Sequence, residues 1–157
     1  MAVQPVPEGY TAVTPYLTIK NAAAAIEFYK KAFGAVEVMR MPMPDGRLMH
    51  AEITIAGAHV MLHDEMPEWG ALGPDTRGGS ASSIMLYVPN VDEVYQRAVA
   101  AGATAKMPVA DQFYGDRCGN VSDPFGHQWT ISTHIEDVPP VELKRRAEKF
   151  LAEQLKR

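Results

Sequence analysis

Apolar and polar positions along the chain follow the same order twice, with an offset of 69 residues. From Tyr16 the chain reads YLTIKNAAAAIEFYKKAFGA, and from Met85 it reads MLYVPNVDEVYQRAVAAGA. Each segment opens with a short apolar run, passes an asparagine, and continues with apolar positions at helical spacing. Asn21 and Asn90 stand where helices commonly begin, because an asparagine side chain can cap free backbone N–H groups. The pattern therefore predicts two strand–helix units, each helix ending near a glycine.

Three strand-like runs follow each predicted helix, separated by turn signals such as Asp45-Gly46. They cover Ala35–Met41, Arg47–Ile55 and Ala58–Asp64, and then Thr104–Ala110, Tyr114–Ser122 and His127–His134. The order strand–helix–strand–strand–strand thus occurs twice, which predicts an α+β fold of two tandem βαβββ modules. We expect a single domain over 1–157, divided into a first module at 10–64, a linker at 65–79, a second module at 80–136 and a C-terminal helix at 137–157.

The two segments outside the modules differ in character. Residues 65–79 are rich in glycine, proline and charge, which indicates a linker or a lid loop, and Trp69 within it either caps a pocket or stands exposed. Pro139–Arg157 carries three excess positive charges, which leaves −7 on the rest of the chain. Its apolar stripe predicts a helix that packs on its own body or on a second copy. The stripe consists of Leu143, Ala147, Phe150, Leu151 and Leu155.

Composition excludes several classes of protein. The chain has 157 residues, of which 46% are hydrophobic and 22% charged, as is ordinary for a globular protein. A net charge of −4 offers no basic surface for nucleic acid, and no apolar run has the roughly 18 residues of a membrane span. Met1–Gly9 lacks the features of a secretory signal, and the single Cys118 has no partner for an internal disulfide. We expect a cytoplasmic protein without nucleic-acid or membrane partners.

The motif LxIxNxxxAIxFYxxxFG in the first half, and DPFGHQW before the final strand, resemble the vicinal oxygen chelate superfamily. That superfamily includes glyoxalase I, extradiol dioxygenases, fosfomycin-modifying enzymes and bleomycin-resistance proteins. HAEI, QFYGDR and DPFGHQWTISTHIEDV are similar to its PhnB-like, glyoxalase/bleomycin-resistance branch. The resemblance covers about residues 10–136, and it implies a cup-shaped mixed sheet, a small-molecule ligand and a homodimer.

The resemblance also implies where the superfamily's enzymes would bind a divalent metal. Their ligands come from the first and last strand of each module, which correspond here to Thr14, Met61, Ser83 and Thr130. None of these residues is a histidine, glutamate, aspartate or cysteine, the side chains that commonly hold a catalytic metal. We therefore expect no metal cofactor at these positions.

Strand alternation places further side chains on the same face as these four positions. Hydroxyl, thioether, aromatic and imidazole groups share that face, and this mixture suits a small organic ligand such as an aromatic compound. The expected ligand-binding residues on the strands are Thr14, Tyr16, Met61, His63, Ser83, Met85, Tyr87, Thr130 and Ser132. The same alternation turns Val13 toward the helix. The charge of −7 on the body favours a neutral or cationic ligand over an anion.

The stretch Gln112-Phe113-Tyr114-Gly115-Asp116-Arg117 supplies two more candidates. Tyr114 and Arg117 contact the ligand if a bulged strand carries them over the cup. The alternative is that Arg117 and Asp116 form a local ion pair that only stabilises the bulge.

His50 and Glu52 are the candidate catalytic residues, because they stand two apart on one strand face and the glutamate can orient the imidazole. A structural polar pair and a metal site relocated to His50, Glu52 and His63 are the alternatives. Three functions follow, and the sequence leaves open whether the chain is an enzyme. The first is a bleomycin-resistance-like protein that binds a small molecule without a metal. The second is a lyase or isomerase that uses His50/Glu52 or a relocated divalent metal, and a third is an interaction protein with a vestigial cup.

Overall fold

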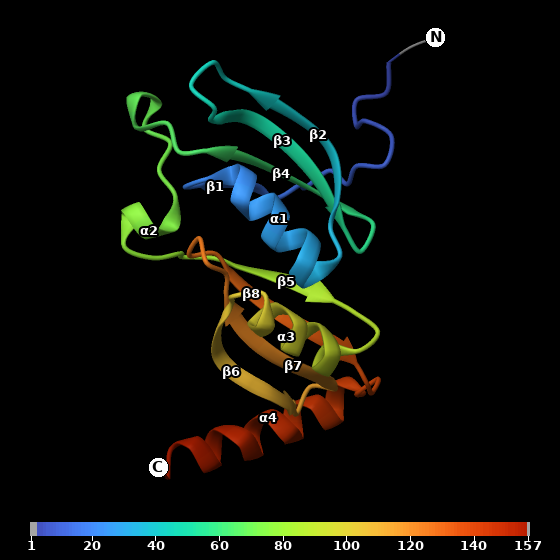
Figure 1. The fold of residues 1–157 in the computed structure, drawn as a ribbon. Coiled ribbons are helices and arrows are strands. Elements are labelled where there is room, and N and C mark those ends of the chain that lie inside the picture. Colours follow the sequence, from blue (N-terminus) through green and yellow to red (C-terminus); the bar gives the residue numbers. More distant parts are fainter. Residues whose placement is uncertain (1–2, 157) are drawn as a thin grey trace.

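The computed structural model describes residues 3–156, which form two four-stranded mixed sheets, each with one long helix across it (Figure 1). The first sheet has the order β1-β4-β3-β2, in which β1 and β4 are parallel and the other neighbours are antiparallel. Its elements are β1 (Tyr16–Ile19), α1 (Ala22–Phe33), β2 (Val36–Pro42), β3 (Leu48–Ile55) and β4 (Ala58–Asp64).

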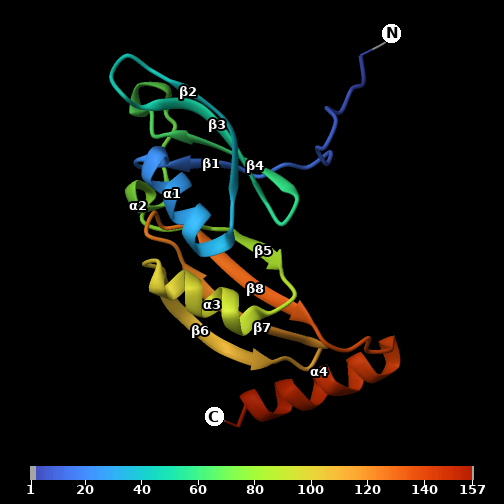
Figure 2. The same ribbon diagram turned by 45° about the vertical axis from the view of Figure 1, so that its right-hand side comes forward.

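The second sheet repeats this topology in the order β5-β8-β7-β6. Its elements are β5 (Ser83–Tyr87), α3 (Val91–Ala100), β6 (Thr104–Asp111), β7 (Asp116–Ser122) and β8 (Gln128–His134). The linker forms η1 (Pro67–Trp69) and α2 (Pro74–Arg77), and the chain ends in α4 (Pro140–Gln154). Figure 2 shows that α1 and α3 lie between the two sheets and that α4 runs beneath the second. The predicted α+β fold of two βαβββ units with a C-terminal helix is confirmed.

The 69-residue repeat extends to the hydrogen bonds that begin each helix. The side chains of Asn21 and Asn90 accept hydrogen bonds from the N–H three residues later, at 3.2 and 3.3 Å. The N–H of Ala22 donates to Oδ1 of Asp64 on β4, at 2.9 Å. In the second module Thr133, 69 residues after Asp64, accepts the equivalent bond through its hydroxyl at 2.9 Å. The last strand of each module therefore fixes the start of its helix.

A buried network around Asp123 joins the modules. The hydroxyl of Tyr29 on α1 donates to Oδ2 of Asp123 at 2.6 Å, and Nε1 of Trp129 donates to the same oxygen at 3.0 Å. His127 Nε2 lies 3.1 Å from the carbonyl oxygen of Thr18 on β1. The DPFGHQW motif thus holds the second module against the first, and His127 is a packing residue of this contact.

Two expectations about the first strand are wrong. Thr14 precedes β1 instead of lying on it, and Val13 is 85% exposed instead of facing the helix. The regular pairing with β4 starts only after Pro15, whose carbonyl accepts the N–H of Met61 at 2.9 Å. The segment predicted as a linker contacts the second module, because a Cβ on Gly126 would lie 2.9 Å from the Cβ of Pro74. Helix α2 therefore packs directly on the 123–126 turn.

Helix α4 forms as predicted, and its apolar stripe is only partly covered by its own chain, with Leu143 and Ala147 half-buried. None of its described residues is buried, and Leu155 is 89% exposed. Phe150 contacts Phe113, with ring centroids 5.1 Å apart, and Arg146 pairs with Glu136 at 2.7 Å. The helix is thus attached at one face and leaves Leu151 and Leu155 at the end of its stripe exposed.

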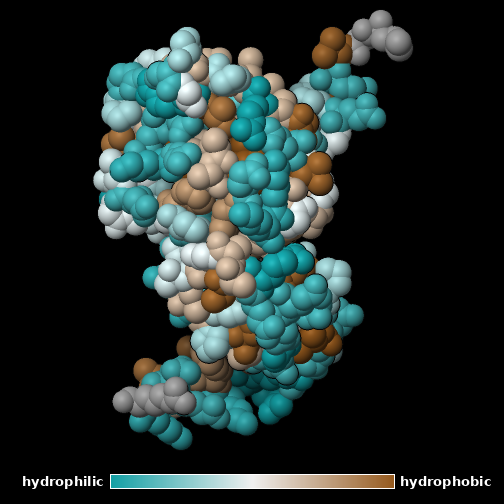
Figure 3. Space-filling model, in the orientation of Figure 1, coloured by the Kyte–Doolittle hydropathy of each residue, from teal (hydrophilic) through white to brown (hydrophobic). Residues whose placement is uncertain are grey.

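On the side where α1 and α3 lie, hydrophobic residues occur as small separate patches among hydrophilic ones (Figure 3). None of the helices that the structure describes is long and apolar enough to cross a membrane.

Candidate functional site

Each sheet has one face covered by its helix and a second face, which we call the open face. On β1 the residues facing α1 are buried, whereas Tyr16 is 54% exposed. The register pairs Tyr16 with Met61 and Glu52 with Met61, so these side chains share the first open face with His50. On the second sheet the pairs Met85–Thr130 and Tyr87–Ser132 share the second open face, together with Ser83, Cys118 and Asn120.

The first open face carries a continuous chain of hydrogen bonds. The hydroxyl of Tyr16 lies 2.9 Å from His50 Nδ1, and His50 Nε2 lies 3.0 Å from Oε1 of Glu52. Tyr10 donates its hydroxyl hydrogen bond to the other oxygen of Glu52, and its ring stacks on His59 at 3.8 Å. Sequence alternation brought His50 to Glu52, but Tyr10 precedes the first strand and has no periodic signal that would place it.

This arrangement favours one tautomer of His50. When Nε2 carries the proton, it donates a hydrogen bond to the carboxylate of Glu52, and Nδ1 is free to accept a hydrogen bond from the hydroxyl of Tyr16. The exposed end of this series of hydrogen bonds is then the hydroxyl of Tyr16, connected to the oriented imidazole of His50. Such a chain can move a proton to or from a molecule that lies against Tyr16.

His63 is separate from this pair. Its Nε2 lies 3.1 Å from the hydroxyl of Thr18, and its Nδ1 lies 2.7 Å from the carbonyl oxygen of Asp64. The ring of Tyr16 packs edge-on against both imidazoles, at 5.5 Å from His50 and 5.0 Å from His63. In the part of the chain that the structure describes, no three histidine, cysteine, aspartate or glutamate side chains are grouped to hold a metal. The relocated metal site is therefore not formed by these residues.

The four positions that correspond to metal ligands in the superfamily do not fit a divalent ion. Ser83 Oγ and Thr130 Oγ1 are hydrogen-bonded to each other at 3.1 Å. Thr14 instead donates to the carbonyl oxygen of Thr11 at 3.2 Å, and Met61 offers a thioether. Two neutral hydroxyls, a third elsewhere and a soft sulfur do not make the site that hard or borderline divalent metals require.

The second open face has a carboxylate hub that the sequence did not indicate. Buried Asp116 accepts hydrogen bonds through Oδ2 from Tyr87 at 2.8 Å and from Ser132 at 3.2 Å. Its Oδ1 lies 2.8 Å from His134 Nδ1, and Asp137 contacts the other ring nitrogen at 3.0 Å. The hydrogen bonds to Asp116 and then Asp137 raise the pKa of His134 above its usual value. Burial alone would raise the pKa of Asp116, but the bonds from its partners outweigh burial and lower it.

The two residues expected from the 112–117 stretch separate. Tyr114 stays near the second open face, where its hydroxyl lies 3.3 Å from the sulfur of buried Cys118, and burial raises its pKa. Arg117 instead forms two 2.8 Å hydrogen bonds with Asp92 on α3 and one with Asp111. The Arg117 guanidinium is thus held by Asp92 and Asp111, away from the other predicted ligand-binding residues. The alternative expectation, an ion pair with Asp116, is not what the structure shows.

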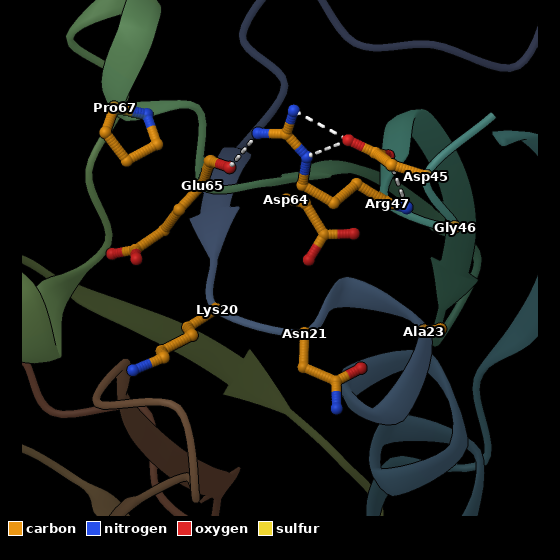
Figure 4. Close-up of a pocket in the computed structure, with 9 residues that line it drawn as sticks. All are labelled: Lys20, Asn21, Ala23, Asp45, Gly46, Arg47, Asp64, Glu65 and Pro67. Atoms are coloured by element: carbon orange, nitrogen blue, oxygen red, sulfur yellow. Dashed lines mark hydrogen bonds and ion pairs between the residues drawn. The ribbon is translucent and has the colours of Figure 1, made fainter. Parts of the chain in front are cut away.

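One cavity, of about 500 Å³, lies away from both open faces, between the start of α1 and the turn after β2 (Figure 4). Apart from Lys20, its charged groups are paired with one another, with neighbouring Glu68 or with the backbone. Arg47 pairs with Asp45 at 2.8 Å and with Glu68 at 2.9 Å. Asp64 accepts the N–H groups of Ala22 and Leu48 at 2.9 and 2.6 Å. These groups hold the elements together, so we do not assign the ligand to this cavity.

A second cavity, of about 330 Å³, opens on the second open face. It brings the predicted Ser83 and Thr130 together with Lys106, Asn120 and Gln128, which the sequence did not single out. Trp69, by contrast, is exposed on η1 in the linker.

Comparisons with known proteins agree with this architecture. Residues 10–131 match the family model of the Glyoxalase/Bleomycin resistance protein/Dioxygenase superfamily. The uncharacterised protein Rv0887c of Mycobacterium tuberculosis is 45% identical over 130 residues, which span 81% of this chain and 76% of that protein. TioX from Micromonospora sp. ML1 has a TM-score of 0.64 at 26% identity, over 80% of this chain and 99% of that one. A PhnB protein from Bacillus cereus has a similar fold, with a TM-score of 0.61 at 20% identity, over 78% and 99% of the two chains.

Proposed function

Because the chain belongs to the Glyoxalase/Bleomycin resistance protein/Dioxygenase superfamily, we propose that it binds a small, aromatic organic molecule on its open faces without a divalent metal. The observation that carries this proposal is the exposure of Tyr16 and Tyr87, each 54% exposed on the face opposite its helix. Each ring stands beside oriented polar groups, His50 in one sheet and Asp116 in the other. Exposed aromatic surface with a few fixed polar groups is typical of a binding surface.

The proposal includes a homodimer in the cytoplasm. Helices α1 and α3 pack together inside the chain, so neither open face is covered by the other module. A second copy placed over these faces would enclose the ligand and exclude water from it. The exposed stripe of α4 offers further apolar surface for the same association. A reduced, unpaired cysteine such as Cys118 is usual for a cytoplasmic protein.

The binding function is tested by titrating aromatic compounds into the protein and following tyrosine and tryptophan fluorescence. Tyr87→Ala is expected to weaken binding about tenfold, because it removes a stacking surface worth about 1.4 kcal/mol. Trp69→Ala is the matched control, since it removes an exposed aromatic side chain from the linker. An equal loss in both variants, or none in Tyr87→Ala, would contradict the assignment of the open face.

A second candidate function is an acid–base enzyme, a lyase or isomerase, and the hydrogen-bond chain on the first open face favours it. His50 lies 3.0 Å from Glu52 and 2.9 Å from the hydroxyl of exposed Tyr16. An imidazole held between a carboxylate and a hydroxyl can remove a proton next to a carbonyl group and return it elsewhere.

Proton transfer and simple binding give different results in D₂O. An enzyme of this type would replace the acidic C–H hydrogen of its ligand with deuterium, which NMR of the ligand detects. His50→Gln would stop this exchange while leaving the affinity within about threefold, because the amide keeps the hydrogen-bonding shape. A ligand that binds tightly and never exchanges would leave the binding protein as the function.

A further inference from the structure

The cavity on the second open face contains a lysine from the edge strand β6. Strands β6 and β7 pair regularly at Ala105–Val121, and the next pair is Met107–Asn120, so Lys106 occupies a bulge in β6. A bulge sets two residues of one strand opposite one residue of its partner and redirects a side chain. Lys106 therefore lines the cavity beside Asn120.

Polar groups in this cavity have unused hydrogen-bonding capacity. The side-chain oxygen Oδ1 of Asn120 is buried and has no hydrogen-bond partner in the described structure. A buried acceptor of this kind costs free energy unless a donor reaches it. Ser83 and Thr130, 3.1 Å apart, line the same cavity and can each donate or accept.

The charge around these groups is positive. Among the described residues that line the cavity, Lys106 carries the charge and none is a carboxylate. The equivalent place on the first sheet is reversed, because Val38 occupies the bulge between Glu37 and Met39, and Met39 pairs with Glu52 as Met107 pairs with Asn120. At this level of the two sheets, the first open face therefore carries the carboxylate of Glu52, and the second carries the neutral amide of Asn120 beside the ammonium of Lys106.

We propose that this cavity binds the oxygen-rich end of a 2-hydroxy carboxylate. The carboxylate lies against the ammonium of Lys106 and the hydroxyls of Ser83 and Thr130, while the ligand's own hydroxyl donates to Oδ1 of Asn120. This assignment rests on the proposed binding function and names its ligand class. It also replaces the expectation from net charge, because the ammonium of Lys106 lines the cavity and lies closer to a bound ligand than the charges spread over the body, which salt screens.

Two probes that differ in one group test the assignment. Mandelate carries an aromatic ring, a hydroxyl and a carboxylate, and 1-phenylethane-1,2-diol replaces that carboxylate with a neutral hydroxymethyl group. The full-length protein is titrated with each and followed by two-dimensional amide NMR, which locates the binding site. We expect mandelate to bind about tenfold more tightly than the diol, with shifts at Lys106 and Asn120, as a charge-assisted hydrogen bond of about 1.4 kcal/mol would produce.

Three variants separate the local charge from the net charge. Lys106→Gln is expected to abolish the preference for mandelate and leave the affinity for the diol unchanged. Lys31→Gln, at an exposed position on α1, changes the net charge equally and is expected to keep the preference. Asn120→Asp places a carboxylate beside Lys106 and is expected to remove mandelate binding while the diol still binds. The amide spectra of the free variants show whether each one is folded.

The outcomes distinguish this assignment from the function on which it rests. If the diol binds as tightly as mandelate, or if Lys106→Gln keeps the preference, the carboxylate site is wrong and the binding function stands. Tighter binding of inorganic phosphate than of mandelate would also overturn the assignment, because phosphate does not need the aromatic surface. If neither probe shifts any resonance of the open faces, the carboxylate site is overturned together with binding of this ligand class.

Discussion

The carboxylate of Asp123 accepts four hydrogen bonds in a site where it is 4% exposed. Oδ1 receives the N–H groups of Phe125 and His127, and Oδ2 receives Tyr29 and Trp129. The backbone bonds shape the turn, and the bond from Tyr29 brings in the other module. One side chain thus joins a local turn to a contact between parts of the chain 94 residues apart.

Tyr29→Phe tests the strength of this contact. The variant leaves the ring in place but removes one donor from a buried carboxylate, so the free energy of unfolding is expected to fall by about 1–3 kcal/mol. Urea unfolding measures the change, and Tyr95→Phe on α3 serves as the control for loss of a tyrosine hydroxyl. Equal stability of the Tyr29→Phe variant and the unmodified protein would show that the bond is not a stabilising link.

Asp116→Asn tests the second hub. Because the pKa of His134 is raised first by Asp116 and then by Asp137, removing the Asp116 charge is expected to lower it. NMR titration of the His134 ring measures the pKa, and Asp137→Asn, at the more exposed partner, is expected to lower it less. A lower pKa in the Asp137 variant than in the Asp116 variant would reverse this order.

The same pair makes stability depend on pH with a defined sign. A histidine whose pKa is raised on folding contributes stability that is complete below its unfolded value of about 6.5. That contribution disappears as the pH rises through the higher folded value. The amide hydrogens from His134 to Asp137 are therefore expected to lose protection above that value, measured against the intrinsic exchange rate at each pH. His134→Gln is expected to remove this loss of protection.

At the scale of elements, the main question is what α4 contributes. Deletion of residues 140–157 is expected to change the free energy of unfolding by less than about 1 kcal/mol, because no described residue of α4 is buried and exposed ion pairs contribute little. If the helix instead packs on a second copy, the deletion weakens the dimer. Light scattering after gel filtration measures the assembly, and urea unfolding measures the stability. The double variant Leu151→Ser, Leu155→Ser keeps the helix but removes its two exposed leucines. It should weaken the dimer as the deletion does.

The sequence predicted the elements well where local signals agree. Asparagine caps and glycine ends gave the range Ala22–Phe33, and the predicted run Ala58–Asp64 coincides with β4. The start of β1 was predicted too early, because alternation continues through Pro15, which has no N–H to donate. Periodicity alone does not show where pairing with the neighbouring strand begins.

The candidate site was predicted only in part, for a physical reason. Alternation assumes a regular pleat, and it correctly brought His50 to Glu52 and Ser83 to Thr130. No face of β6 was assigned from the sequence, so Lys106 was not expected in the cavity, and the pairing of β6 with β7 has two register shifts. Asp116 and Tyr10 were missed because their contacts join segments that are far apart in the sequence. Trp69 lies in a segment without strand or helix periodicity, so its exposure could not be predicted.

For the whole molecule, the proposed homodimer has a thermodynamic signature. Association stabilises the folded state by mass action, so the melting temperature is expected to rise with protein concentration. Calorimetry over about a hundredfold range of protein concentration measures this rise. A ligand that fills the open faces should increase the melting temperature further. A melting temperature that does not depend on concentration would indicate a monomer at these concentrations.

The contact through Tyr29 and Asp123 has a consequence for the linker. Since α1, α3 and the 123–126 turn already hold the modules together, the covalent connection over residues 65–79 need not determine their relative position. Its contribution is a high effective concentration of one module around the other. A protein cleaved once by a protease in this segment would then remain a single particle. The two modules, expressed as separate polypeptides, would likewise associate with each other.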